Sequence, residues 1–408
     1  MSGGTQRVAV RPQQLAALAD RFDESRAYEL VQRLAGEEFS GRQTGTAGSR
    51  AAGDFLVELL GSLGLEPWID GFPVPAAPLL MAAPLLRIGP SLLEHRRDFA
   101  EHPRSGFVPT ERSGLARDAD TAGAGDWALI RAVPPGGGLD RLVADLVDRG
   151  VVGLLTPQYA DASGFLTKRL LGGPPLPLPV VAVRPDLLAT ADGEPVTANA
   201  PLQQTEVTGR NIFFGPRWVP TEHAAPAVLV VAHYDGVGAD PERHLPAAGD
   251  NATGVAVICE AARIIAEQPP GARPLLFAAV DAEELGAQGS RAHARALAAA
   301  GTPAVALNLD MAGKWHGTVA VELGGDSDEL YAALDSAGRA LDIPLAGAPV
   351  ASDNRSYVAA GFPAAGLGLG AEHYHSPLDG IEHVDPAALR TAGRLVLGTV
   401  HQLLHPNP

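Results

Sequence analysis

The sequence is short of basic residues, and nearly all of those it has are arginine. Only Lys168 and Lys314 are lysines, and 31 basic residues against 47 acidic ones give a net charge of −16 over 408 residues. Nucleic acids and anionic membrane surfaces both repel an acidic protein. We therefore expect neither of them as a partner.

The sequence also has little cysteine and no long apolar run. The single cysteine, Cys259, excludes a disulfide bond within the chain, and its apolar helical surroundings, VAVICEAARII, are typical of a buried, inert thiol. No segment has the ~18–20 unbroken apolar residues that cross a bilayer. The first twenty residues lack the apolar core of a secretory signal. These absences predict a cytoplasmic protein.

The chain does have a hydrophobic content of 46%, which is typical of a globular protein. From residue 208 onward, short apolar runs of strand length alternate with helical patterns. Such alternation predicts a mainly parallel sheet that helices cover on both faces. The expected fold is therefore α/β: a three-layer α/β/α domain with a mainly parallel, mixed central sheet. The apolar runs are AVLVVA (227–232), PLLFAAV (274–280), PAVALNL (303–309), TVAVEL (318–323) and PAAGLGL (363–369).

Residues 75–205 have a different texture, which is rich in proline and loops. Within this region DWALIRA and VVGLLT have strand patterns, and LDRLVADLVDRG between them has a helical one. We expect a smaller, β-rich α/β domain at residues 85–200. It would be inserted into a discontinuous main domain formed by residues 1–80 and 205–408.

Acidic residues and histidines follow several of the later apolar runs, at the point where each strand would end. The carboxyl ends of parallel strands meet at one edge of a sheet, and ligands bind there in such folds. We therefore expect these side chains to lie close together. Those after the runs are His233, Asp235, Asp281, Glu283, Glu284, Asp310 and His375, and Asp250 stands just before a predicted helix.

Each of these residues has an ordinary explanation when it is taken alone. Asp250 is placed like a helix N-cap, and Glu283 and Glu284 are placed like first-turn residues that the helix dipole favours. Together with Asp235 and Asp310, however, they would bring five carboxylates into one cleft. Their repulsion and desolvation would cost several kcal/mol or force protonation. A bound cation relieves both effects.

The ligand types indicate which cation this would be. Two imidazoles among carboxylates favour zinc, or a similar metal such as cobalt or manganese, over calcium or magnesium. Five ligands exceed the three that one open catalytic zinc usually takes, so a shared carboxylate would give two sites of three. Two Zn²⁺ ions, the carboxylates of Asp250, Glu284 and Asp310, and one bridging hydroxide sum to zero charge. Glu283 is then left free.

Five motifs carry a resemblance to a known family. They are HYD (233–235), GDNATG (249–254), DAEELG (281–286), NLDMAG (308–313) and YHSPLD (374–379). In content, order and spacing they resemble the signatures of the co-catalytic di-zinc aminopeptidases, a group that includes bacterial leucyl aminopeptidases and glutamate carboxypeptidases. The resemblance covers about residues 25–70 and 208–405. Residues 85–200 stand where many relatives carry a protease-associated (PA) domain.

The resemblance implies a ligand set. His233 and Asp310 would hold one zinc ion, Glu284 and His375 would hold the other, and Asp250 would bridge the two. It also implies a cis peptide bond after Asp250.

The resemblance implies three further roles near the metals. Asp235 would orient His233 through its second ring nitrogen. Glu283 would be the general base that activates the hydroxide between the metals. Tyr374, directly before His375, would steady the oxyanion that forms from the substrate.

These residues predict a zinc-dependent exopeptidase, and more narrowly an aminopeptidase that hydrolyses N-terminal residues from peptides. Two alternatives stay open. The first is a carboxypeptidase or small-amide hydrolase of the same family, which would need a cationic clamp for the substrate carboxylate; Arg355 is the candidate. The second is a non-catalytic binding protein on the same scaffold. The complete ligand set favours an enzyme. The sequence indicates neither a preferred side chain nor an oligomeric state.

Overall fold

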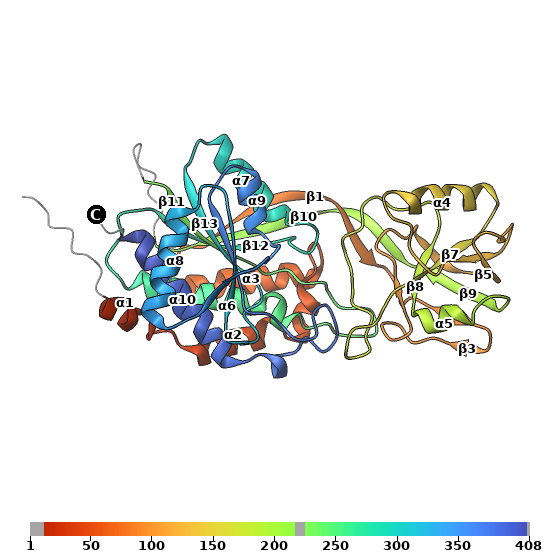
Figure 1. The fold of residues 1–408 in the computed structure, drawn as a ribbon, viewed down its shortest axis with the longest axis horizontal. Helices are drawn as coiled ribbons and strands as arrows, with labels where there is room; N and C mark the ends of the chain where they lie inside the picture. The colour runs from red at the N-terminus through yellow and green to blue at the C-terminus, as the bar shows by residue number, and fades with distance from the viewer. Residues whose placement is uncertain (1–11, 217–224, 406–408) are drawn as a thin grey trace, which may run out of the picture.

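The computed structural model describes residues 12–216 and 225–405, which are organised around two eight-stranded sheets. Figure 1 shows the two sheets at opposite ends of an elongated molecule. They are joined by two long antiparallel strands, β1 (Trp68–Leu80) and β10 (Leu202–Phe214). The chain leaves the first sheet along β1 and returns along β10, so the residues between them form the second sheet.

The first sheet has the strand order β1-β10-β12-β11-β13-β16-β14-β15. Its later strands are β11 (Ala227–His233), β12 (Leu275–Val280), β13 (Ala304–Leu309), β14 (Val319–Gly324), β15 (Leu345–Gly347) and β16 (Ala364–Gly368). The four central strands, β12, β11, β13 and β16, run parallel, whereas β10 and β14 pair with them in the antiparallel direction. All five apolar runs are therefore strands of one mixed sheet, as predicted.

Helices cover both faces of this sheet. One face carries α1 (Pro12–Ala19), α2 (Glu24–Leu34), α3 (Ala47–Ser62), α6 (Thr253–Ala266), α8 (Asp328–Leu341) and α10 (Pro386–Leu404), and the other carries α7 (Gln288–Ala299) and α9 (Asn354–Ala359). Alternate residues of a strand point to opposite faces. In β11, Val228 and Val230 belong to the larger core, whereas Leu229 and Val231 pack with α7 and α9. Figure 1 shows α7 and α9 above the sheet and α2, α6 and α10 below it, so the three-layer prediction is confirmed.

The lone thiol lies where its helical pattern indicates. Cys259 is on α6 with 2% of its surface exposed, and burial raises the pKa of the thiol. The prediction of a buried thiol is confirmed. Within residues 12–216 and 225–405, no helix combines the length and the apolarity that crossing a membrane requires.

The second sheet is built from residues 86–200 and has its own hydrophobic clusters, one of them around the fully buried Trp127. We refer to residues 85–200 as the insert. Its strands are β2 (Leu86–Ile88), β3 (Ser91–Leu92), β4 (Phe99–Glu101), β5 (Val108–Asp118), β6 (Trp127–Leu129), β7 (Gly153–Pro157), β8 (Val180–Val183) and β9 (Pro195–Ala200), with helices α4 (Gly138–Asp148) and α5 (Pro185–Ala189). The domain boundaries given above and the protease-associated type of the insert stay predictions.

A buried arginine ties the N-terminal helices to the loops that follow β11. Arg42 is fully buried and donates to four backbone carbonyls: Tyr234 (2.8 Å), Leu34 (2.7 Å), Pro246 (3.0 Å) and Ala247 (2.6 Å). Burial lowers the pKa of Arg42 to about 10, so the guanidinium stays charged at neutral pH. It therefore holds residues 34–42 against the loop after β11, 192–205 positions further along the chain.

We expect Arg42→Met to lower the free energy of unfolding by about 3 kcal/mol or more, because four buried carbonyls lose their donors at once. Urea unfolding followed by circular dichroism measures this change. Arg339→Met is the matched control, since Arg339 is largely exposed on α8, where it pairs with Asp335. An Arg42→Met variant as stable as this control would contradict the assigned role.

Candidate metal centre

Adjacent parallel strands deliver the predicted ligands to one edge of the first sheet. His233 is the last residue of β11, Asp310 directly follows β13, and Glu284 comes four residues after β12. His375 lies in the loop after β16. Asp250 lies in a short irregular turn (Ala248–Ala252) directly before α6. It is not the N-cap of that helix: Ala252 occupies the cap position and no side chain bonds there, so the N-cap interpretation is wrong.

Three of these side chains form a first buried cluster. His233 Nε2 lies 3.3 Å from Asp250 Oδ1 and 3.4 Å from Asp310 Oδ1. One ligand atom from each residue lies within 4.8 Å of the other two. All three residues are buried, so water does not separate their charges.

A second cluster shares Asp250 with the first. His375 Nε2 lies 3.2 Å from Asp250 Oδ2 and 2.9 Å from Glu284 Oε2, again with all three ligand atoms within 4.8 Å. The two oxygens of Asp250 therefore face different imidazoles, Oδ1 towards His233 and Oδ2 towards His375. This is the arrangement that a bridging carboxylate requires.

The five side chains fit a pair of transition-metal ions. Ligands at about 2.0–2.2 Å from a zinc ion lie on the order of 3–4 Å from one another, as they do here. The site also demands positive charge. Burial lowers the pKa of His375, but the carboxylates of Glu284 and Asp250 outweigh it and raise the pKa to about 10. Burial also lowers the pKa of His233, but Asp310, Asp235 and Asp250 outweigh this effect and raise that pKa well above its ordinary value. Without a cation, the two clusters retain protons on their imidazoles instead.

Asp235 positions groups on both sides of the clusters. Its carboxylate accepts the backbone N–H of Glu283 (3.1 Å) and of Glu284 (3.2 Å). Its Oδ1 lies 3.5 Å from His233 Nδ1, and its backbone oxygen is closer to that nitrogen, at 3.2 Å. One residue thus orients the imidazole of His233 and fixes the backbone of both glutamates.

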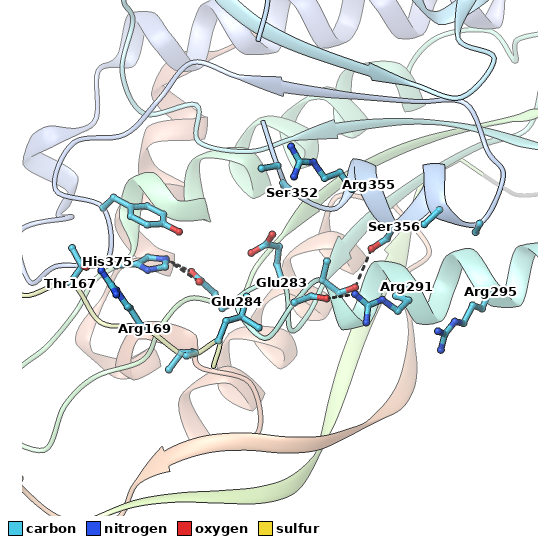
Figure 2. A pocket seen from close by; sticks show the side chains of 18 residues that line it. Thr167, Arg169, Glu283, Glu284, Arg291, Arg295, Ser352, Arg355, Ser356 and His375 are labelled. Atoms are coloured by element: carbon cyan, nitrogen blue, oxygen red, sulfur yellow. Dashed lines mark hydrogen bonds and ion pairs between the residues drawn. The ribbon is translucent and has the colours of Figure 1, made fainter. Parts of the chain in front are cut away.

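The two adjacent glutamates face different targets. Glu284 reaches His375 in the second cluster, whereas Glu283 belongs to neither cluster and points into the neighbouring cavity (Figure 2). Burial raises the pKa of Glu283 well above its ordinary value. His233 opposes that rise, and Asp353 and Asp310 add to it. A carboxylate with a raised pKa holds an accepted proton better, as a general base must.

Asp281, the other acid at the end of β12, is structural. Its carboxylate accepts from Thr44 Oγ1 (2.7 Å), from the backbone N–H of Arg210 (2.9 Å) and from Tyr234 Oη (3.1 Å). It therefore anchors the start of the Glu283 turn and belongs to neither cluster.

The turn that carries Asp250 is held from two sides. Asp379 accepts the backbone N–H groups of Gly249 (2.7 Å) and Asp250 (3.2 Å). Asn251 donates to Leu309 O (2.9 Å), next to Asp310. The peptide bond between Asp250 and Asn251 is cis, as the resemblance implied.

Left-handed backbone at non-glycine residues accompanies every ligand loop. The residues are Ala247 (φ 50°), Ala282 (φ 61°), Met311 (φ 58°) and His375 (φ 55°). Each such conformation costs about 1–2 kcal/mol and persists only where its surroundings enforce it. The hydrogen bonds of Arg42, Asp235 and Asp379 supply that enforcement near three of the ligands.

Tyr374 lies over one of the predicted ligands. Its ring stacks on His375 with centroids 3.6 Å apart, and it is 46% exposed. Burial of the hydroxyl end and the nearby carboxylates, led by Asp250, raise the pKa of the phenol. The hydroxyl therefore remains a hydrogen-bond donor at neutral pH.

Lys168 of the insert completes the surroundings of His375, and no motif pointed to this residue beyond the rarity of lysine in the chain. Its backbone N–H donates to His375 O (3.0 Å), and its carbonyl lies 3.0 Å from His375 Nδ1. Because a carbonyl can only accept, Nδ1 carries the ring proton, which leaves Nε2 free for a cation.

The side chain of Lys168 anchors this contact. Its buried Nζ donates to Gly238 O (3.1 Å) and Ala239 O (3.2 Å) and pairs with Asp240 Oδ1 (3.1 Å). Asp240 also pairs with the buried Arg96 of the insert, at 2.7 Å. Buried charges therefore lock the insert to the loop after β11.

A cavity of about 760 Å³ opens beside the clusters. Figure 2 shows Glu283, Glu284 and His375 on its wall, together with Thr167 from the insert. Tyr374 lines it as well. We refer to this space as the cavity. It gives a substrate access to Glu283 and to the second cluster.

The fold and the paired clusters together define a metallo-exopeptidase. In particular, residues 216–400 match the family model described as Peptidase family M28. The resemblance to co-catalytic metallopeptidases is thereby confirmed at the level of the family.

Relatives cover most of the chain. The sequence is 26% identical to aminopeptidase YwaD of Bacillus subtilis (strain 168) over 418 aligned residues. This alignment covers 93% of this chain and 85% of the relative. The fold is similar to that of BSAP, a zinc aminopeptidase from Bacillus subtilis, with a TM-score of 0.73 and 22% identity over 94% of this chain and 95% of that one. It is also similar to an aminopeptidase from Aneurinibacillus sp. strain AM-1, with a TM-score of 0.69 and 21% identity over 95% of each chain. These two structures support the fold.

We expect Lys168→Met to weaken zinc binding about 10- to 100-fold at one of two sites, because the carbonyl that orients His375 loses its anchor. Titration of the metal-free variant with zinc, in competition with a chromophoric chelator, measures both affinities. Arg131→Met is the control; it removes an exposed cation of the insert that pairs with the exposed Asp118. Two unchanged affinities in a folded Lys168→Met variant would show that this anchor is dispensable.

Proposed function

We propose that the protein is a zinc-dependent aminopeptidase that removes N-terminal residues from peptides. The observation that carries the proposal is the carboxylate of Asp250, whose two oxygens face His233 at 3.3 Å and His375 at 3.2 Å. A second support is that the relatives with similar sequence or fold are named aminopeptidases, one of them a zinc aminopeptidase.

The ligand set of the proposal has two ions per chain. His233 and Asp310 would hold one zinc ion, Glu284 and His375 would hold the other, and Asp250 would bridge them. Three donors for each ion leave positions open for water and substrate. Cobalt or manganese suits the same mixture of imidazole and carboxylate donors.

The bound metals would supply an activated water and a Lewis acid for the scissile carbonyl. In this proposal Glu283 takes the proton of the attacking water and hands it to the amine that leaves. Asp235 keeps Glu283 and His233 in position through the contacts described above. The Tyr374 hydroxyl donates to the oxygen on which negative charge develops.

The insert is part of this proposal as a protease-associated-like domain within a discontinuous peptidase domain. Two observations support a role at the site rather than decoration. Its Lys168 exchanges two hydrogen bonds with His375, and its Thr167 lines the cavity.

The alternatives from the sequence fit the site less well. Arg355, the candidate clamp of a carboxypeptidase, donates to Glu322 at 2.8 Å and so is already paired. A binding protein without activity would need neither the full set of five proposed metal ligands nor a glutamate, Glu283, that stands outside both clusters and faces the cavity. The carboxylates of Glu283 and Glu284 on the cavity wall suit the free amine of an aminopeptidase substrate.

We expect the protein to hydrolyse aminoacyl amides with a free amine and to spare their N-blocked counterparts. Activity should disappear after chelation and return when zinc is added back, because the water is activated only at the metals. A panel of free and acetylated aminoacyl p-nitroanilides measures both effects. Cleavage of the blocked substrates alone would reject the aminopeptidase proposal. Activity indifferent to chelation would reject any metal-dependent one.

We expect Glu283→Gln to lower kcat by about 10²–10⁴-fold with zinc content unchanged, because the amide cannot accept the proton. The adjacent substitution Glu284→Gln is the matched comparison, since it should lower zinc content first. Metal analysis of the purified variants and steady-state kinetics measure the two effects. Near-normal turnover in Glu283→Gln would remove that residue from the mechanism.

A further inference from the structure

Four arginines line the cavity beside Glu283. Arg291 and Arg295 come from α7, Arg355 from α9 and Arg169 from the insert. Three segments far apart in sequence thus bring cations to one place, in a chain whose net charge is −16. The proposed mechanism uses none of them.

Two of these arginines are neighbours on one helix face. Arg291 and Arg295 are four residues apart on α7, where like charges repel each other. Arg291 also stands near the start of that helix, where the helix dipole disfavours a cation. Its guanidinium donates to Gly286 O at 3.0 Å. Within residues 12–216 and 225–405, neither side chain forms an ion pair, whereas Arg355 pairs with Glu322.

Two of the cations lie on the side of Glu283 away from His375. In Figure 2, Glu283 stands between His375 on one side and Arg291 and Arg295 on the other, with Arg355 above it. Arg169 lies on the His375 side in the same view. A substrate whose scissile bond reaches Glu283 therefore places its neighbouring groups within the field of these guanidinium groups.

We propose that the cavity selects peptides that carry a carboxylate next to the scissile bond, and that Arg291 and Arg295 bind this carboxylate. The proposal rests on the proposed aminopeptidase function. A guanidinium presents its N–H groups in a fork that matches a carboxylate, so two of them on one helix face form a suitable binding pair. The carboxylate is that of an acidic side chain. The C-terminus of a dipeptide offers the same group.

Three matched substrate pairs separate these sources. The first pair, Glu-p-nitroanilide and Gln-p-nitroanilide, tests the side chain of the N-terminal residue. The second, Leu-Glu-NH₂ and Leu-Gln-NH₂, tests that of the next residue, and the third, Leu-Gln and Leu-Gln-NH₂, tests the C-terminal carboxylate. We expect at least one carboxylate member to have a kcat/KM about 10-fold above that of its neutral partner. A difference below about twofold in all three pairs would overturn the proposal.

The metals also attract carboxylates, so the preference must be traced to the arginines. In the double variant Arg291→Gln/Arg295→Gln we expect the ratio within the favoured pair to fall to about one. The control Arg339→Gln, at a largely exposed arginine of α8, should keep the wild-type ratio. A preference that survives the double substitution would assign it to the metals and overturn the proposal.

A binding measurement separates this proposal from the proposed function. Calorimetric titration of zinc-loaded Glu283→Gln with Leu-Glu-NH₂ and Leu-Gln-NH₂ reports affinity without turnover. If the wild-type protein hydrolyses no substrate with a free amine, the aminopeptidase proposal fails, yet tighter binding of a carboxylate ligand that depends on Arg291 and Arg295 would still support the cavity proposal. Normal hydrolysis with equal affinities and equal rates would leave the function intact and reject the carboxylate preference.

Discussion

The carboxylate of Asp250 lies buried between two imidazoles, and the surrounding structure keeps that negative charge in place. Three further carboxylates, those of Asp310, Glu284 and Asp235, stand around it at the ends of neighbouring strands. A low-dielectric site holds so many acids only with positive charge among them. The turn itself is held by hydrogen bonds: the backbone N–H groups of Gly249 and Asp250 donate to Asp379, and the Arg42 guanidinium donates to the carbonyl of Ala247. Local backbone strain at the same loops is tolerated because these contacts are numerous and buried.

The two sheets are not independent units at this site. Lys168 of the insert and His375 of the first sheet's loop exchange backbone and ring contacts at 3.0 Å. Behind that contact, Lys168 and Arg96 share the buried carboxylate of Asp240. An ion pair buried this deeply is costly to separate, because each partner would be left as an unpaired charge. The insert therefore contributes both to the orientation of a proposed ligand and to the wall of the cavity.

Net charge and local charge have opposite signs in this molecule. The net charge of −16 disfavours large anionic partners such as nucleic acids. The cavity next to Glu283, in contrast, is lined by four arginines from three segments. Within a few ångströms, the nearest side chains set the electric field, and screening suppresses the distant ones. The adjacent glutamates illustrate the same principle at closer range. Glu284 faces an imidazole and Glu283 faces a cavity, although one peptide bond separates them.

The sequence by itself determined the alternation of strands and helices from residue 208 onward, the buried thiol of Cys259 and the side chains that converge at one sheet edge. It could do so because strand periodicity and residues at strand ends are local patterns, and parallel strands end at a common edge. Only the tertiary structure decided that Arg42 donates to the carbonyls of Tyr234 and Ala247, 192 and 205 positions away. The same holds for the pairing of Lys168 with His375, 207 positions away, and for the lining of one cavity by Arg169, Arg291 and Arg295. Such contacts depend on how loops of unrelated segments pack, and no periodicity in the chain encodes that packing.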